Sequence, residues 1–179
     1  MLKMGSSWLA VVLVGSLAGC ATTSTKSADV SSQIRTSLDQ AGFKDVSASQ
    51  DRDQGVVTLG GHVAADGDKA QAESIARSIA GAQVVANQIA VIPPGAETEA
   101  EKVNSDLDKG IKNNLDAALI RDRLHENVKY AVKNHVVTLT GEVDSQSKRV
   151  RAGEVASAVL NVYQVVNELQ VKGQKASSN

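Results

Sequence analysis

The chain alternates between two hydrophobic periods, and it does so in the same order twice. Residues 57–63 and 85–91 alternate apolar and polar positions, as half-buried strands do. Between them, apolar residues recur at helical spacing on one face: Ala72, Ile75, Ala76 and Ile79. A short strand is expected over residues 46–50, and an amphipathic helix precedes it. The pattern predicts the order helix, strand, strand, helix, strand.

The second half of the chain repeats the first at an offset of eighty residues. Residues 55–91 align without a gap on residues 135–171, so that GVVTLGGHV becomes HVVTLTGEV. The helical positions recur as Ala152, Val155, Ala156 and Val159. Two copies joined by a linker are a duplicated domain rather than a solenoid. The predicted fold class is α+β, with two tandem αββαβ domains, each a three-stranded mixed sheet covered by two helices.

Two small or polar residues recur inside the strands of both copies. Gly61 and Gly141 interrupt an apolar strand, and the simplest explanation is the close approach of the alanine-rich helix to the sheet. Asn87 and Asn167 stand on the inward side of the last strand, where a buried amide commonly satisfies neighbouring backbone groups. All four residues are interpreted as structural.

Polar and proline-containing segments mark the limits of the two domains. A small polar tether follows an N-terminal leader, and Pro93-Pro94-Gly95 begins a second tether in mid-chain. The expected division is a signal peptide over 1–19, a tether over 20–27, a first domain over 28–92, a linker over 93–104, a second domain over 105–172 and a tail over 173–179.

The first twenty residues indicate export and lipid attachment. Lys3 precedes an apolar stretch from Trp8 to Ala18, which is too short to span a bilayer but typical of a secretory signal. Leu17-Ala18-Gly19-Cys20 resembles a bacterial lipobox, and Cys20 is the only cysteine in the chain. The resemblance implies cleavage before Cys20 and acyl chains on it, and Ala21 favours the outer membrane. The alternative is an ordinary signal peptide followed by an unpaired cysteine.

Composition and charge narrow the class of partner. Aromatic residues make up 2% of the chain and the formal net charge is −1, which argues against a nucleic-acid partner. Residues 27–92 contain five Lys or Arg against eight Asp or Glu, a net charge of −3. From residue 105 onward the numbers are eleven against nine, a net charge of +2. The two copies are therefore expected to face different partners.

The repeated motifs are similar to those of a known domain family. A strand of the form V-x-L-x-G-x-V, a helix carrying Ala72 or Ala152, and a strand of the form V-x-N-x-L/I-x-V resemble the BON domain (bacterial OsmY and nodulation). Two such copies behind a lipobox resemble the dual-BON outer-membrane lipoproteins of the DolP kind. The resemblance implies a lipid-anchored, periplasm-facing protein, without enzymatic activity, that supports outer-membrane integrity.

The leading helix of the second copy is the predicted contact with phospholipid. In the DolP-like lipoproteins this helix binds anionic phospholipid, and here it places cations beside an apolar tip when its apolar face is turned inward. The predicted contact residues are Lys109, Lys112, Ile120, Arg123 and Leu124. The competing interpretation is an ordinary solvated helix, because Asp108, Asp116 and Asp122 dilute the positive charge and Leu124 can fill the core.

The sequence offers no repeated set of catalytic or metal-binding residues. His62, His125 and His135 occupy positions that do not align between the copies, and Asp51-Arg52-Asp53 lacks the later ligands of a calcium loop. No cofactor and no metal is expected. The rival function is that of an OsmY-like, stress-induced periplasmic chaperone or assembly factor, for which an envelope protein rather than lipid would be the partner.

Overall fold

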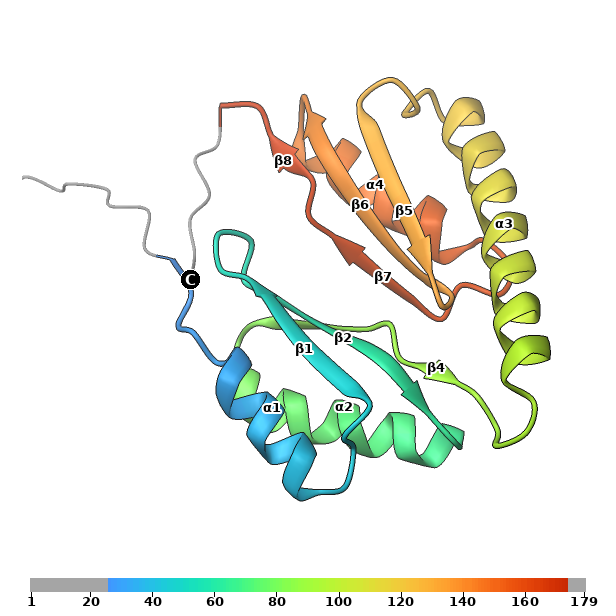
Figure 1. Ribbon diagram of the computed structural model, residues 1–179. Coiled ribbons are helices and arrows are strands. Elements are labelled where there is room, and N and C mark those ends of the chain that lie inside the picture. The colour runs from blue at the N-terminus through green and yellow to red at the C-terminus, as the bar shows by residue number, and fades with distance from the viewer. Residues whose placement is uncertain (1–25, 174–179) are drawn as a thin grey trace, which may run out of the picture.

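Two copies of one α+β arrangement make up residues 26–173, the part of the chain that the computed structural model describes (Figure 1). The first copy contains α1 (Ser31–Gln40), β1 (Val46–Asp51), β2 (Val56–Val63), α2 (Asp66–Ala80), β3 (Val84–Asn87) and β4 (Ala90–Val91). The second contains α3 (Glu97–Arg121), β5 (Val128–Lys133), β6 (Val136–Val143), α4 (Gln146–Ser157), β7 (Gln164–Asn167) and β8 (Gln170–Val171). The predicted fold class is confirmed, whereas the predicted signal peptide and Cys20 lie outside the described residues.

In each domain, a mixed sheet forms around one central strand. β1 pairs antiparallel with β2, and β3 and β4 pair parallel with successive parts of β2. The strands β5 to β8 repeat this arrangement around β6. The predicted third strand is thus split into two pieces. At the break, Oδ1 of Asn87 accepts a hydrogen bond from the N–H of Ile89 (3.3 Å), and Asn167 and Leu169 repeat the contact at 3.2 Å.

The same two amides tie the third strand to the covering helix. Asn87 is fully buried and donates through Nδ2 to Glu73 Oε2 (2.8 Å) and to the carbonyl oxygen of Lys69 (3.3 Å) on α2. Asn167 donates to the carbonyl oxygen of Arg149 on α4 (2.8 Å). Because a buried amide is costly only when its groups lack partners, these bonds let a polar side chain fix the helix against the sheet.

Two helices cover one face of each sheet and enclose a separate aliphatic core. The first core includes, from α1, α2 and β2, the residues Ile34, Leu38, Ala72, Ala76, Val57, Leu59 and Val63. The second includes, from α3, α4 and β6, the residues Ile111, Leu115, Leu119, Ala152, Val155, Ala156, Val137, Leu139 and Val143. The helical and strand periodicities of the sequence therefore identify the buried faces.

The glycine shared by the two copies makes room for a neighbouring backbone, so the prediction that a helix approaches it is wrong. Gly61 and Gly141 have φ values of 91° and 117°, which strain any residue with a side chain. A Cβ atom at Gly61 would lie 1.9 Å from the carbonyl oxygen of Asp45. One at Gly141 would lie 2.5 Å from that of Asn127. These carbonyls precede β1 and β5, so the close approach comes from the adjacent strand and not from α2 or α4.

The segment predicted as a linker, residues 93–104, is only partly irregular, because α3 begins at Glu97. Its first turn carries Glu97 and Glu99, whose charges favour a helix N-terminus, and the N–H of Gly95 donates to the Glu97 carboxylate (2.9 Å). The helix runs along one side of the molecule, past both domains (Figure 1). The sequence pattern missed this extension because residues 97–104 lack an apolar stripe.

The uncovered faces of the two sheets meet through equivalent positions. The four buried residues at this contact form two pairs that are each eighty residues apart: Val56 with Val136, and Ala86 with Val166. Gln164 of β7 joins the strand edges, donating to the carbonyl oxygen of Val85 (2.7 Å) and accepting from the N–H of Asn87 (3.0 Å). The contact therefore has the form of an isologous interface within one chain.

Candidate functional site

The helix α3 carries the residues that the sequence predicts for phospholipid contact. It contains 25 residues, which corresponds to a length of about 37 Å. Ile111, Leu115 and Leu119 are buried beneath it, which leaves the opposite side to solvent. The charges on that exposed side decide whether the helix suits an anionic surface.

The acidic residues of α3 that were expected to dilute its positive charge are all engaged by the second domain. Asp108 accepts hydrogen bonds from the N–H groups of Asn134 and His135, both at 2.8 Å. Asp122 pairs with Arg151 (3.1 Å), and only 18% of its side chain is exposed. The third residue, Asp116, contacts Tyr130 and His125. Since these three carboxylates already have partners in the second domain, they offset less of the positive charge at the C-terminal end of α3 than its sequence indicates.

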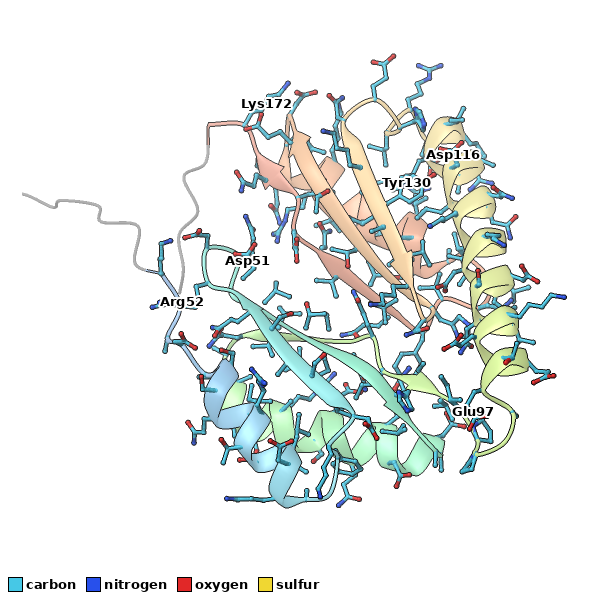
Figure 2. All side chains as sticks on the ribbon, in the orientation of Figure 1. Asp51, Arg52, Glu97, Asp116, Tyr130 and Lys172 are labelled. Carbon is cyan, nitrogen blue, oxygen red and sulfur yellow. The ribbon has the colours of Figure 1, made fainter. Side chains whose placement is uncertain are left out.

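Asp116 lies between two groups of the second domain. It accepts a hydrogen bond from the Tyr130 hydroxyl (3.0 Å) and lies 3.0 Å from Nε2 of His125. Figure 2 shows Asp116 on α3 beside Tyr130 on β5. Burial, together with the hydrogen bond to Asp116, raises the pKa of Tyr130. The phenol therefore stays protonated and continues to donate to the carboxylate at neutral pH.

Leu124 is not available for lipid contact, so its place in the predicted set is wrong. It is 4% exposed and belongs to the second core. Arg123 adopts a φ of 56°, and the N–H of Leu124 donates a hydrogen bond to the carbonyl oxygen of Leu119 (2.9 Å). This is a Schellman turn, in which the residue after the left-handed position packs back on the helix. A glycine at position 123 would have signalled the turn in the sequence.

The remaining predicted residues separate into two groups along α3. Ile120 is 55% exposed, and Arg121 and Arg123 beside it are exposed with no ion pair to any residue in 26–173. We call these three residues the α3-end patch. Lys109 and Lys112 precede Ile120 by about 16 and 12 Å of helix. The residues predicted to form a single phospholipid contact therefore lie at two separate places on α3. The sequence prediction did not include Arg121, which lies beside Ile120.

Lys109 and Lys112 line a cleft between the two domains, with a volume of about 480 Å³. The end of β5 contributes Lys133, the turn that follows contributes Asn134, and the end of β2 contributes His62. Lys109 pairs with Asp106 (3.0 Å). Sequence reasoning could not find Lys133, because only the tertiary structure brings the end of β5 beside α3.

A second cavity of about 520 Å³ continues from this cleft and shares Ala90, Asn104 and Asn134 with it. There the Lys69 ammonium lies 4.9 Å from the centre of the Tyr163 ring, a cation–π contact between the domains. Burial lowers the pKa of Lys69, and the nearby acidic groups oppose this effect only in part. The second cavity is therefore less suited to a strongly charged ligand than the first.

The three histidines lie at separate places in the structure and do not form a catalytic set. His62 lines the cleft, His125 faces Asp116, and His135 follows the β5–β6 turn with its Nε2 buried and unpaired. Within residues 26–173, no three His, Cys, Asp or Glu side chains are grouped as metal ligands require. None of the helices in this range is long and apolar enough to cross a membrane.

Comparisons with known proteins agree with the repeat. The family model of the BON domain matches residues 26–93 and 105–173. The osmotically-inducible protein Y of Escherichia coli (strain K12) is 30% identical over 146 residues, which cover 80% of this chain and 71% of that protein.

Two solved structures of CdsD, a structural protein of the type III secretion system of Chlamydia trachomatis, are also similar. One, its C-terminal domain, is 14% identical with a TM-score of 0.33; the match covers 79% of this chain and 65% of that chain, less than two thirds. The other is 13% identical with a TM-score of 0.35, covering 80% and 92%. Scores at this level are too low to support an argument about structure or function.

Proposed function

The chain belongs to the BON-domain family, and from this premise we propose that it is a lipid-anchored, periplasm-facing protein of the outer membrane that supports envelope integrity. Acyl chains on Cys20 are its first attachment, and the α3-end patch is a second, weaker contact with anionic phospholipid. The similarity to an osmotically inducible protein supports a role in the response to osmotic stress. The proposal includes no catalytic step.

The α3-end patch is the observation that carries the proposal. An exposed isoleucine stands beside two arginines that make no ion pair within residues 26–173, while Asp116 and Asp122 are occupied by Tyr130, His125 and Arg151. An apolar side chain among cations can enter the headgroup layer while the cations meet lipid phosphates. Because the anchor raises the effective concentration of this contact, weak affinity is sufficient.

The described chain begins beside the turn before β2, on the side of the molecule away from α3 (Figure 1). Arg52, in the turn before β2, holds Ser27 by two hydrogen bonds (2.9 and 2.8 Å), and Figure 2 shows this turn close to where the described chain begins. The six residue steps from Cys20 to Lys26 span at most about 20 Å. The cleft section of α3 lies at the other end of β2, about 25 Å away. The C-terminal end of α3 also lies across the molecule from this turn in Figure 1, so the tether favours neither section of α3.

Vesicle co-sedimentation of a form without Cys20 tests the lipid contact. We expect the protein to bind vesicles containing phosphatidylglycerol and not those of phosphatidylcholine alone, and Ile120→Asp to weaken binding by about tenfold. Val150→Asp is the matched control, since Val150 is 49% exposed but lies on α4. Equal loss in the two variants, or no binding by the native protein, contradicts the proposed contact.

Metabolic labelling with a fatty acid tests the anchor separately. The native protein should be labelled and should fractionate with the outer membrane, whereas Cys20→Ala should be unlabelled and released from the membrane. Equal labelling of both proteins contradicts lipid attachment at Cys20.

One feature favours the rival function as a chaperone or assembly factor. Leu160 and Tyr163, between α4 and β7, are 76% and 61% exposed, which offers apolar surface to an envelope protein. The rival predicts that the native protein suppresses the aggregation of an unfolding client and that Leu160→Ser reduces this effect. Suppression that Leu160→Ser leaves unchanged counts against this surface.

A further inference from the structure

The cleft between the domains gathers positive charge from two separate parts of the chain. Lys109 and Lys112 come from α3, and Lys133 comes from the end of β5. Neither Lys112 nor Lys133 makes an ion pair within residues 26–173. The cleft volume, about 480 Å³, is within the range of small-ligand sites.

The lining also carries two carboxylates, and Lys109 is already paired with Asp106 (3.0 Å), so Lys112 and Lys133 are the cleft lysines without an ion pair in residues 26–173. Asp108 lines the cleft, but both of its oxygens accept backbone N–H groups of the β5–β6 turn. Glu101 is the other carboxylate in the lining. The side chains of Asn104, Ser105 and His62 make no hydrogen bond to another described residue, so their polar groups are free to meet a ligand.

The contacts of Asp108 and Asn134 hold the two walls of the cleft in place. Asp108 fixes the β5–β6 turn to α3, and Asn134 Nδ2 donates to the carbonyl oxygen of Gln88 in the first domain (2.6 Å). The backbone at Lys133 is therefore fixed at the same cleft as Lys112 before any ligand arrives. A fixed backbone reduces the loss of freedom on binding an anion compared with a flexible loop, and only the exposed lysine side chains remain to be ordered.

The cluster is a property of the second copy alone. Eighty residues earlier, Asp53 and Gln54 occupy the positions of Lys133 and Asn134. The repeat fold therefore does not require these residues. Because the cleft needs His62 from one domain and the lysines from the other, it exists only when the domains pack together.

We propose that this cleft binds a phosphate group, carried by a small soluble anion or by a lipid headgroup, through Lys112, Lys133 and Lys109. Ammonium groups pair with phosphate oxygens by charge-assisted hydrogen bonds, and the free amide and hydroxyl of Asn104 and Ser105 add neutral donors. The site is distinct from the α3-end patch, which lies about 12 Å or more further along the helix.

Titration of the full chain in non-ionic detergent with inorganic phosphate and with glycerol 3-phosphate tests the proposal. We expect saturable binding with a Kd on the order of 1 mM, and a shift of the His62 imidazole resonance with the same midpoint. Lys112→Gln and Lys133→Gln should each weaken binding at least about fivefold. Lys129→Gln is the matched control, because Lys129 is exposed on the same strand as Lys133 but outside the cleft.

The outcomes separate this site from the lipid contact proposed above. No saturable binding, or equal weakening by Lys129→Gln, overturns the proposal. If Lys133→Gln also lowers binding to phosphatidylglycerol vesicles, the phosphate belongs to a lipid headgroup; if vesicle binding is unchanged, it belongs to a soluble ligand. Ile120→Asp should leave phosphate binding intact, so a failure of the α3-end patch does not remove the cleft site.

Discussion

The leading helices α1 and α3 end in the same turn, but with different residues at the left-handed position. In the first domain Gly42 has a φ of 94°, and the N–H of Phe43 returns to the carbonyl oxygen of Leu38 (2.9 Å). In the second domain Arg123 occupies the left-handed position, and the N–H of Leu124 donates to the carbonyl oxygen of Leu119. Left-handed backbone costs a residue with a side chain about 1 kcal/mol relative to glycine. The second domain therefore keeps a cation at the end of α3 against a backbone penalty.

Part of the difference in net charge between the two copies also lies on and beside α3. The acidic first domain has Asp53 where the second has Lys133, and the cations of the cleft and of the α3-end patch lie on α3, just after it, and at the end of β5. Other cations of the second domain lie on α4, as Lys148, Arg149 and Arg151 do. The cores of the two domains, by contrast, use equivalent positions. Comparison of the domains thus separates the residues that build the fold from those available for binding.

The largest expected effect is loss of the glycine that both domains need. Gly61→Ala and Gly141→Ala should each destabilise the protein by about 3 kcal/mol or more, because the new methyl group meets a carbonyl oxygen and the backbone is strained. The loss should be greater at Gly61, where the contact is closer. Urea unfolding followed by circular dichroism measures both. Gly110→Ala on α3 is the control and should be neutral or stabilising, because its Cβ would meet nothing within 4 Å.

The next largest effect should distinguish the two asparagines. Asn87→Ala removes two bonds to α2 and one to the strand break, so the free energy of unfolding should fall by about 2 kcal/mol. Asn167→Ala removes two hydrogen bonds rather than three, so the free energy of unfolding should fall by about 1 kcal/mol. Urea unfolding followed by circular dichroism measures both variants. A greater loss of stability in Asn167→Ala than in Asn87→Ala would contradict this prediction.

Replacement of Arg123 should move stability and binding in opposite directions. Arg123→Gly should raise the free energy of unfolding by about 0.5–1 kcal/mol, because glycine relieves the left-handed backbone, and should weaken binding to anionic vesicles. Asn161→Gly is the control, since Asn161 has a φ of 67° where the first domain has Gly81. It should leave vesicle binding unchanged. A variant of Arg123 that binds vesicles normally would remove this residue from the α3-end patch.

The smallest expected effect is a dependence on acid pH in the second domain alone. Hydrogen bonds from Lys148 and then Lys172 lower the pKa of Asp144 from 3.8 to about 2. Because the folded value is the lower one, the stabilisation is present above about pH 4 and is lost as the pH falls through about 2. The first domain has Ala64 at this position. Carboxyl titration followed by NMR should show the low pKa, and Lys148→Gln should raise it.

The sequence alone predicted the strand and helix order, the duplication and the buried faces, since these follow from local periodicity. Ile111 and Leu115 were placed inward by spacing alone, and the structure buries both. Leu124 was misplaced because an arginine makes a turn that glycine usually makes. The α3 extension was missed because a polar helical segment carries no apolar stripe.

What the sequence by itself determined is therefore the pair of domains, because each strand and helix is specified by residues close together in the chain. Only the tertiary structure decided which carboxylates are occupied, why Gly61 is needed and how the predicted lipid contact divides. Asp108 meets the β5–β6 turn 26 residues later, and Gln164 meets β3 across 77 residues. Contacts over such separations depend on how the elements pack, and hydrophobic periodicity does not encode them.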